Sequence, residues 1–326
     1  MLMRASRWLL IGAVSAALIA SAWALADVVA KDSSGVLVRQ GTPHQALFAV
    51  AFEGSEGLAV GAAGELLASS DAGATWRTQS VPTQASLLGV SMRNGHAVVV
   101  GLSGVVLVRD AAGNWSVATS GTTERLFAVD LDGRGAVVAV GAFGRLLRST
   151  DGGLQWTSIA PDWTQEYTEQ GLEPHLYDVA LADDGSILVV GEFGLVIQSA
   201  DGGASWKVRR KDEASLFAID LGADGVGYAV GQGGVIARTA DGGARWSEVA
   251  SGSMANLLDV RRTPRGRVVV TAMRDMLESE DGMSWRRIAW DDFGSGWYAG
   301  VATANSNEAT PVIVVGHAGR IVTLSR

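Results

Sequence analysis

Short apolar runs separated by polar turns recur along most of the chain. The first set comprises residues 47–50, 58–61 and 66–69, and a further run follows Trp76. Runs of this length with turn residues between them are typical of antiparallel β-strands. Later sets open at Leu87, Leu126, Leu176, Leu216 and Leu257. Near-continuous apolar stretches, such as residues 136–140 and 187–190, indicate strands covered on both faces. The pattern predicts a series of four-stranded sheets, with strands A to D in each.

A second pattern closes each set. It reads hydroxyl residue, any residue, Asp, any residue, Gly, two residues, Trp. The Asp carboxylate can accept hydrogen bonds from a tight turn, glycine supplies the required backbone angles, and Trp provides an apolar plug. We therefore interpret the motif as a structural lock on the turn. The motif occurs six times, and its second and sixth copies are degenerate. Its Asp and Trp residues are Asp71, Trp76, Asp110, Trp115, Asp151, Trp156, Asp201, Trp206, Asp241, Trp246, Asp281 and Trp285.

The spacing of these motifs indicates the architecture. The six Trp residues are separated by 39, 41, 50, 40 and 39 residues, and a period of roughly 40 is typical of one propeller blade. The motif is the Asp box, or bacterial neuraminidase repeat. Together with the G-x-x-G steps that precede it, it makes the chain resemble the photosystem II stability/assembly factor-like family of propellers. The resemblance covers nearly all of the chain after its first 30 or so residues. The glycine pairs of these steps lie at 61/64, 101/104, 141/144, 191/194, 231/234 and 316/319. In the sixth copy we expect Thr271 and Arg274 at the corresponding positions.

The two ends of the chain complete the count of blades. Residues 297–303, 312–316 and 320–324 make three strands, and residues 35–39 can supply the fourth. We therefore predict an all-β fold over residues 27–326: a seven-bladed β-propeller of four-stranded antiparallel blades, with the last blade closed by the N-terminal strand. Such closure removes open sheet edges.

Residues 1–26 read as an export signal. Arg4 and Arg7 precede an apolar run, and Ala24-Leu25-Ala26 fits a cleavage site. The alternative is an uncleaved anchor, since a single span needs about 20 residues. In either case we expect a periplasmic location. The chain has no cysteine, so its core must hold it together without disulfides. Its formal net charge of −8 disfavours nucleic acid as a partner.

The residues favour a protein that is not an enzyme and has no cofactor. A sialidase would need an Arg-Ile-Pro segment, which does not occur, and the chain has only four tyrosines. Other glycosidases need a carboxylate pair across a cleft, whereas Asp130, Asp178, Asp220 and Asp259 recur at matching points of strand A and favour a channel-lining, structural role.

Metal and phosphate sites have little support. Each box offers one carboxylate where calcium needs six or more oxygens, and the four histidines show no zinc spacing. The glycine steps do not match a phosphate loop. A glycan-binding or glycoside-cleaving propeller remains the alternative.

The loops offer a surface for a partner. In such blades the B–C and D–A loops share one face, and the box turns occupy the other. An insertion of about ten residues precedes Leu176, and a polar loop extension lies at residues 305–310. Each is either a functional loop or an insertion that the fold tolerates. Aromatic residues and arginine are enriched in interfaces. The candidate partner-binding residues are Phe143, Arg145, Trp163, Glu192, Phe193, Arg209, Arg210, Arg274, Phe293, His317 and Arg320.

The family resemblance implies a role. Its photosynthetic members assist photosystem II biogenesis, and similar bacterial propellers are expected beside RND-type exporters. We therefore expect a scaffold or assembly factor that docks onto a membrane protein complex, with peripheral membrane association through that partner.

Overall fold

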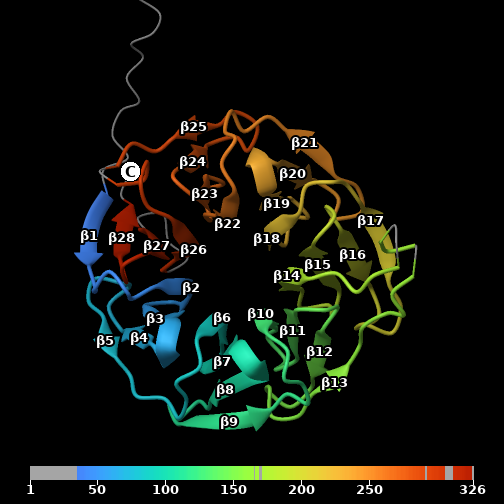
Figure 1. The fold of residues 1–326 in the computed structure, drawn as a ribbon, viewed down its shortest axis with the longest axis horizontal. Helices are drawn as coiled ribbons and strands as arrows, with labels where there is room; N and C mark the ends of the chain where they lie inside the picture. The colour runs from blue at the N-terminus through green and yellow to red at the C-terminus, as the bar shows by residue number, and fades with distance from the viewer. Residues whose placement is uncertain (1–34, 165, 169–170, 291, 305–310, 325–326) are drawn as a thin grey trace, which may run out of the picture. The chain divides into compact units, whose positions relative to one another are not determined.

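Within residues 35–164, 166–168, 171–290, 292–304 and 311–324, which the computed structural model describes, seven four-stranded antiparallel sheets follow one another around a channel (Figure 1). Each sheet is one blade, numbered I to VII, with strand A nearest the channel and strand D at the rim. The predicted seven-bladed, all-β propeller is confirmed. All the described blades belong to one compact unit, Ser34–Arg326.

The first four blades each follow the predicted order of strands. Blade I contains β2 (Leu47–Glu53), β3 (Glu56–Gly61), β4 (Leu66–Ser69) and β5 (Arg77–Thr78). Blade II contains β6 (Leu87–Arg93), β7 (His96–Gly101), β8 (Val105–Arg109) and β9 (Trp115–Thr119). Blade III contains β10 (Leu126–Leu131), β11 (Val137–Gly141), β12 (Leu146–Ser149) and β13 (Thr157–Ser158). Blade IV contains β14 (Leu176–Leu181), β15 (Ile187–Gly191), β16 (Val196–Ser199) and β17 (Lys207–Arg210).

The last three blades complete the ring. Blade V contains β18 (Leu216–Leu221), β19 (Gly227–Gly231), β20 (Ile236–Thr239) and β21 (Ser247–Val249). Blade VI contains β22 (Leu257–Arg262), β23 (Val268–Ala272), β24 (Met276–Ser279) and β25 (Arg286–Arg287). Blade VII contains β26 (Tyr298–Thr303), β27 (Val312–Gly316), β28 (Ile321–Leu324) and, at the rim, β1 (Gly35–Arg39). Single 3-10 turns span Ala62–Gly64, Leu102–Gly104 and Gln232–Gly234.

The core lies between the blades. Each of the seven seams among the described blades contains its own cluster of buried apolar side chains. At the seam of blades III and IV, for example, Val138 and Val140 pack with Leu176 and Val189. Strand B therefore has neighbouring blades on both of its faces, which explains its near-continuous apolar sequence.

The N-terminal strand closes the ring as predicted. β1 pairs with β28 in antiparallel register, with Gly35 opposite Leu324 and Leu37 opposite Val322. Figure 1 shows these two strands, the first and last of the coloured chain, side by side. The chain then continues from β1 into β2, and so joins blade VII to blade I.

The Asp boxes lock their turns through hydrogen bonds. In blade IV the Oδ1 atom of Asp201 accepts from the Ser205 N–H at 2.9 Å and from the Ser199 hydroxyl at 2.7 Å, while Oδ2 accepts from the Ser205 hydroxyl at 2.6 Å. These bonds lower the pKa of Asp201 to about 2, with the Ser205 hydroxyl as the largest cause. Gly203 has φ +96°, and a Cβ there would lie 2.5 Å from the Ile159 side chain. These contacts are those expected of a structural lock, and the contribution of the boxes to folding stays a prediction.

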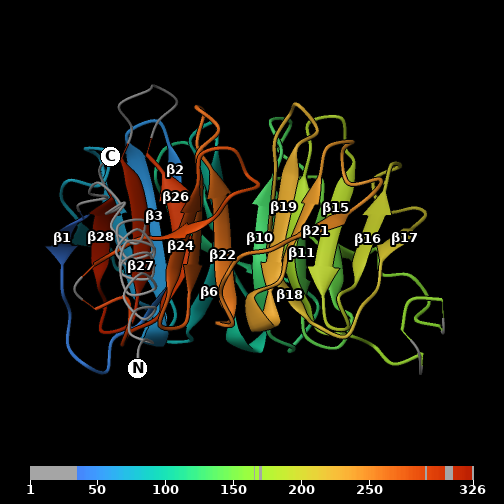
Figure 2. The same cartoon turned by 90° about the horizontal axis from the view of Figure 1, so that it is seen from above.

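The two faces of the ring are distinct. On one face, which we call the B–C face, the Gly144 N–H of a B–C turn donates to the Pro174 carbonyl of a D–A connection at 2.7 Å. On the other, the box face, the Gly152 N–H of a box donates to the Gly135 carbonyl of an A–B hairpin at 3.1 Å. Figure 2 shows the strands running between these two sets of loops. The predicted grouping of loops is therefore confirmed.

One expected position is wrong by a residue. Leu257 pairs with Ala272, as Leu47 pairs with Gly61, so Ala272 and Asp275 hold the glycine positions of blade VI instead of Thr271 and Arg274. Arg274 takes the third position of the turn, with φ +60°.

Some predictions concern residues beyond those that the structure describes. The export signal at residues 1–26 and the polar loop extension at 305–310 both lie outside them. In the described part of the chain, no helix has the length and apolar character needed to cross a membrane.

Candidate binding face and channel

A β-bulge near the start of strand A directs one side chain per blade toward the channel. In blade III, Leu126 pairs with Gly141 and Ala128 with Val140, so Phe127 between them has no partner. The same register shift occurs in the strand A of every described blade. Because strand A starts at the B–C face, these residues surround the channel mouth there. They are Phe48, Leu88, Phe127, Tyr177, Phe217, Leu258 and Ala299, and all seven line the cavity described next.

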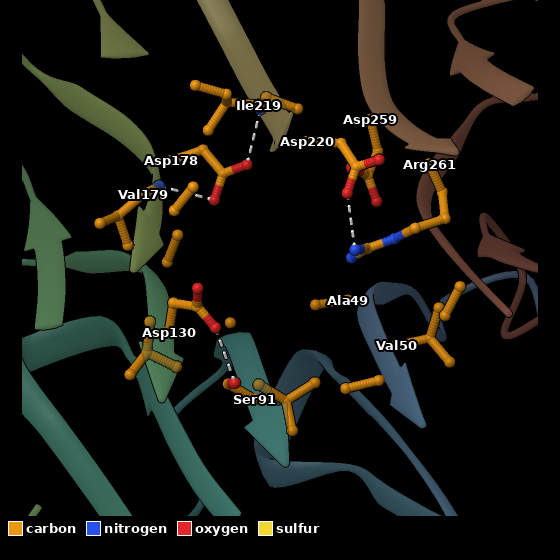
Figure 3. Close-up of a pocket in the computed structure, with 18 of the residues that line it drawn as sticks. Ala49, Val50, Ser91, Asp130, Asp178, Val179, Ile219, Asp220, Asp259 and Arg261 are labelled. Atoms are coloured by element: carbon orange, nitrogen blue, oxygen red, sulfur yellow. Dashed lines mark hydrogen bonds and ion pairs between the residues drawn. The ribbon is translucent and has the colours of Figure 1, made fainter. Parts of the chain in front are cut away.

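The channel holds a cavity of about 440 Å³ lined by strand A residues. Asp130, Asp178, Asp220, Asp259 and Arg261 lie in its wall, and Figure 3 shows their side chains on facing sides of the hollow. The sequence predicts that the aspartates occupy matching points of strand A, and this prediction is wrong. Asp178 and Asp259 are the third residues of their strands, whereas Asp130 and Asp220 are the fifth. The carboxylates therefore form two levels within the channel.

Each of these carboxylates joins its blade to the next. The Oδ2 atom of Asp178 accepts from the Ile219 N–H at 2.9 Å, and its Oδ1 accepts from the Val179 N–H at 2.8 Å (Figure 3). Asp130, Asp220 and Asp259 likewise accept, each at 2.8 Å, from the N–H groups of Leu181, Arg262 and Val301 in the following blades. The predicted structural, channel-lining role is confirmed.

Burial makes Asp130, Asp178 and Asp259 weaker acids than an exposed aspartate. It raises the pKa of Asp178 to about 8, and the nearby Asp259 carboxylate adds to this shift. Burial also raises the pKa of Asp259 to about 6, and it raises the pKa of Asp130 above its ordinary value. The Arg261 guanidinium pairs with Asp220 at 2.8 Å. Raised values of this kind also occur at catalytic sites. Here, however, both oxygens of Asp178 accept backbone hydrogen bonds, and the arrangement recurs in four consecutive blades, so structural linkage accounts for it.

Three candidate partner-binding residues occupy unusual turn positions on the B–C face. The third residue of the B–C turn has a left-handed backbone in every blade, with φ +53° at Phe143, +59° at Phe193 and +60° at Arg274. The rings of Phe143 and Phe193 are 50% and 44% exposed. The equivalent residues in blades I, II and V are Ala63, Ser103 and Gly233. Bulky residues are uncommon in this conformation because Cβ crowds the backbone.

Other candidates interact within the chain. Asp292 accepts from the Tyr298 hydroxyl at 3.0 Å, lies 2.9 Å from His317 Nε2 and pairs with Arg320. Phe293 is 3% exposed and packs edge-on against Tyr298 at 4.9 Å between ring centroids. The expectation that Phe293 presents its ring on the surface is therefore wrong, because this ring helps to fill the seam of blades VI and VII.

The two arginines of β17 also interact within the chain. Arg209 donates to Gln198 at 2.8 Å, and Arg210 pairs with Asp212 at 2.7 Å and with Glu248 at 2.5 Å. Arg145 is exposed at the end of its B–C turn.

The insertion before β14 packs on the B–C turn of blade III. The Trp163 indole lies so close to Gly144 that a Cβ there would be 2.2 Å from Nε1, and Trp163 contacts the buried Tyr167 ring at 5.4 Å. His175 ends the insertion. Its Nδ1 accepts from the Phe143 N–H at 3.1 Å, and its N–H donates to Glu192 at 2.8 Å.

Sequence reasoning missed an aromatic arc at the channel mouth, formed by Phe143, His175, Phe127, Tyr177 and Phe217. Ring centroids are 4.9 Å apart for Phe143 and His175, 5.6 Å for Phe127 and Tyr177, and 5.3 Å for Tyr177 and Phe217. A signal was present, because four of the sets open with Leu followed by an aromatic residue. Only the bulge, however, reveals that this second residue faces the channel.

The fold and the boxes define the chain as an Asp-box β-propeller. Residues 160–257 match the family model described as Photosynthesis system II assembly factor YCF48, and this segment spans blades IV and V. The resemblance expected from the sequence is confirmed: the chain is similar to photosystem II assembly factor-like β-propellers, by the family model over residues 160–257 and by fold in the solved structures. No curated protein matches it.

Solved structures agree on the fold. YCF48 bound to D1 peptide is similar at 16% identity and a TM-score of 0.70, over 90% of this chain and 96% of that one. YCF48 from Cyanidioschyzon merolae has 19% identity and a TM-score of 0.72, over 90% and 99% of the two chains. The GH74 xyloglucanase from Xanthomonas campestris has 16% identity and a TM-score of 0.67, over 90% of this chain and 53% of the enzyme. At these identities the likeness concerns the fold alone.

Proposed function

We propose that this propeller is a non-enzymatic assembly or accessory factor that binds an extended segment of a membrane protein complex on its B–C face. The match of residues 160–257 to an assembly factor family supports the role, and a similar structure is that of YCF48 bound to a D1 peptide. A periplasmic location and peripheral membrane association through the partner are parts of the same proposal. An RND-type exporter as that partner has no support from these matches and stays a prediction.

The observation that carries the proposal is the pair of exposed rings at left-handed turn positions. Ala63, Ser103 and Gly233 make the same turn, so folding does not require Phe143 or Phe193 there. An exposed aromatic ring on a strained backbone is unfavourable for the isolated protein. Aromatic anchors of this kind often dominate protein interfaces.

The test is a pull-down from detergent-solubilised membranes with the full chain as bait. Phe193→Gly keeps the turn and removes the ring, and we expect it to weaken capture roughly thirtyfold, as for a central anchor. Ala63→Gly, at the equivalent position of blade I, is the matched control and should leave capture unchanged. Ala204→Glu alters the box face. Loss of capture with Ala204→Glu alone, at unchanged melting temperatures, would place docking on the opposite face and contradict the proposal.

The glycoside-cleaving alternative has weaker support. It predicts an unrepeated carboxylate pair on the B–C face, whereas the channel carboxylates recur and bind backbone N–H groups. The enzyme neighbour named above is a distant one, matched over about half its length.

A further inference from the structure

The cavity and the aromatic arc form one continuous feature. Phe127, Tyr177 and Phe217 belong to the arc and also line the cavity, so the arc forms one side of its mouth. The carboxylates of Asp178 and Asp130 lie one and three residues further along their strands than the arc residues Tyr177 and Phe127. A chain entering from the B–C face would therefore meet aromatic rings first and carboxylates below them.

We propose that this channel mouth binds an extended, positively charged polypeptide segment, with a Lys or Arg side chain directed toward the channel carboxylates and apolar neighbours against the aromatic arc. This inference rests on the proposed function, since it specifies the chemistry of the segment that the B–C face would bind.

The cavity has a suitable size and composition for such a segment. Its volume of about 440 Å³ falls within the range of ligand pockets, roughly 300–1,000 Å³. On the side away from the acidic blades its wall includes the small residues Ala49, Gly89 and Ala302, beside larger ones such as Leu88 and Met92. The aromatic side chains are partly exposed. Their faces can attract an ammonium or guanidinium group.

The charge of the wall determines the sign of the occupant. Four aspartates face the cavity. The two arginines in its described lining, Arg93 and Arg261, are already paired with Asp183 and Asp220. A channel walled by one sign of charge concentrates the field and favours a ligand of the opposite sign. Burial and the nearby Asp259 carboxylate raise the pKa of Asp178, and a bound cation would favour the ionised form of this carboxylate. An acidic segment or a nucleic acid would be repelled.

Two labelled peptides test the proposal. Both are ten residues long with the same leucine and phenylalanine positions, and they differ only in carrying two lysines or two glutamates. Binding to the full chain is followed by fluorescence anisotropy. We expect the lysine peptide to bind about tenfold more tightly, a difference equivalent to about 1.4 kcal/mol, and to weaken with added salt.

Variants then locate the site. Asp178→Asn removes a carboxylate that a bound cation would ionise, and Phe217→Leu removes one ring while keeping an apolar side chain. Each change should weaken binding of the lysine peptide about fivefold or more. Glu56→Gln, an exposed change at the box-face end of β3, is the charge control and should leave binding unchanged. Circular dichroism verifies that each variant folds. Equal binding of both peptides, or lysine-peptide binding unaffected by both channel variants, would overturn the proposal.

These outcomes separate the inference from the proposed function. If the two peptides bind equally while Phe193→Gly still weakens capture of the membrane partner, the proposed docking face is supported. The proposal that the channel mouth binds a positively charged segment is then wrong. If the lysine peptide binds as expected but capture ignores Phe193→Gly, the channel binds cationic segments and the proposed assembly role fails.

Discussion

At the scale of the residue, one backbone conformation accommodates five different residue types. The third position of the B–C turn has a left-handed backbone in each described blade, but holds Ala63, Ser103, Phe143, Phe193, Gly233, Arg274 or Ala318. Small residues and glycine are the ones that tolerate this conformation best. Phe143, Phe193 and Arg274 are therefore larger than the turn itself requires.

Arg274 allows the cost of this conformation to be measured. We expect Arg274→Gly to stabilise the protein by about 1 kcal/mol, because glycine adopts φ +60° without crowding. Chemical denaturation measures the change. Arg145→Gly, at an exposed residue outside the left-handed region, is the matched control and should not stabilise. A loss of stability in Arg274→Gly would show that the arginine side chain contributes more than the turn costs.

The Trp residue of a box should contribute most to the lock. Trp206 is 9% exposed, and its Nε1 donates to the Ile159 carbonyl in the preceding connection at 2.8 Å. We expect Trp206→Ala to cost about 3–5 kcal/mol. Asp201→Ala should also lower the melting temperature, because it leaves turn N–H groups without their acceptor. Unchanged melting of both variants would contradict the lock.

The channel carboxylates predict an unusual dependence of stability on pH. The pKa of Asp178 is about 8 in the folded protein and near 3.9 in an unfolded chain. Because the folded value is raised, the stability that Asp178 contributes is full below about pH 4 and is lost as the pH rises through about 8. Asp130, Asp220, Asp259 and Arg261 face the same cavity and remain in the variant.

Asp178→Asn cannot titrate, so its melting temperature should improve relative to the wild type between pH 5 and pH 9. A change of 1 kcal/mol corresponds to roughly 2–4 °C. Asp184→Asn on the box face is the control. The pKa of Asp184 is lowered, chiefly by its hydrogen bonds with Ser186, so its contribution is constant over this range. A flat difference for Asp178→Asn would show that the carboxylate is already ionised at neutral pH.

At the scale of the element, the sequence predicts most strands because the apolar runs and boxes are local signals. The prediction fails where only the spacing between residues indicates the position of a turn. Leu47 and its paired Gly61 are 14 residues apart, whereas Leu257 and its paired Ala272 are 15 apart, since the A–B hairpin varies in length. Without glycines to mark the turn, the spacing of the repeats predicts the B–C turn of blade VI one residue too early. The same local reading could not reveal that the channel aspartates alternate between two levels.

The closing strand is the element whose removal should matter most. A chain that starts at Gly41 lacks β1, which leaves the edge of β28 open and removes the Arg39–Glu65 ion pair of 2.7 Å. Loss of its ladder hydrogen bonds alone should cost about 3 kcal/mol or more, and the open edge should promote aggregation. A chain that starts at Gly35 keeps β1 and is the control. Equal melting of the two chains would show that β1 contributes nothing to closure.

At the scale of the whole molecule, the candidate site exists only because the ring closes. The arc residues Phe127, Tyr177 and Phe217 come from three blades, and each is separated from the next by 40 or 50 residues of sequence. No local pattern could predict their contact. The number of blades can be predicted because each sequence repeat forms one blade. The inward direction of these rings cannot, because it follows from a β-bulge that has no sequence motif.

A circular permutant tests how closure stabilises the ring. Joining Leu324 to Gly35 through a linker copied from the box of blade IV, with new ends at residues 41–43, makes blade VII continuous. Blades VII and I then meet through side chains such as Leu47, Val50 and Ile313 and through the backbone bridge between Ala46 and His317. We expect the same seven blades, but a stability about 3–5 kcal/mol lower, because the closing constraint on a long loop is lost. Urea denaturation measures the midpoint.

The matched permutant moves the ends to the A–B hairpin of blade IV, between Asp183 and Asp184. Its blade IV is then split between the two chain ends, as blade VII is in the natural chain. The hydrogen-bond ladder between β14 and β15 would close the ring as the ladder between β1 and β28 does now. We therefore expect it to match the natural chain closely. If instead both permutants are equally stable, side-chain packing at the seam closes the ring, and the split blade is a consequence of where the chain ends lie and not a device for stability.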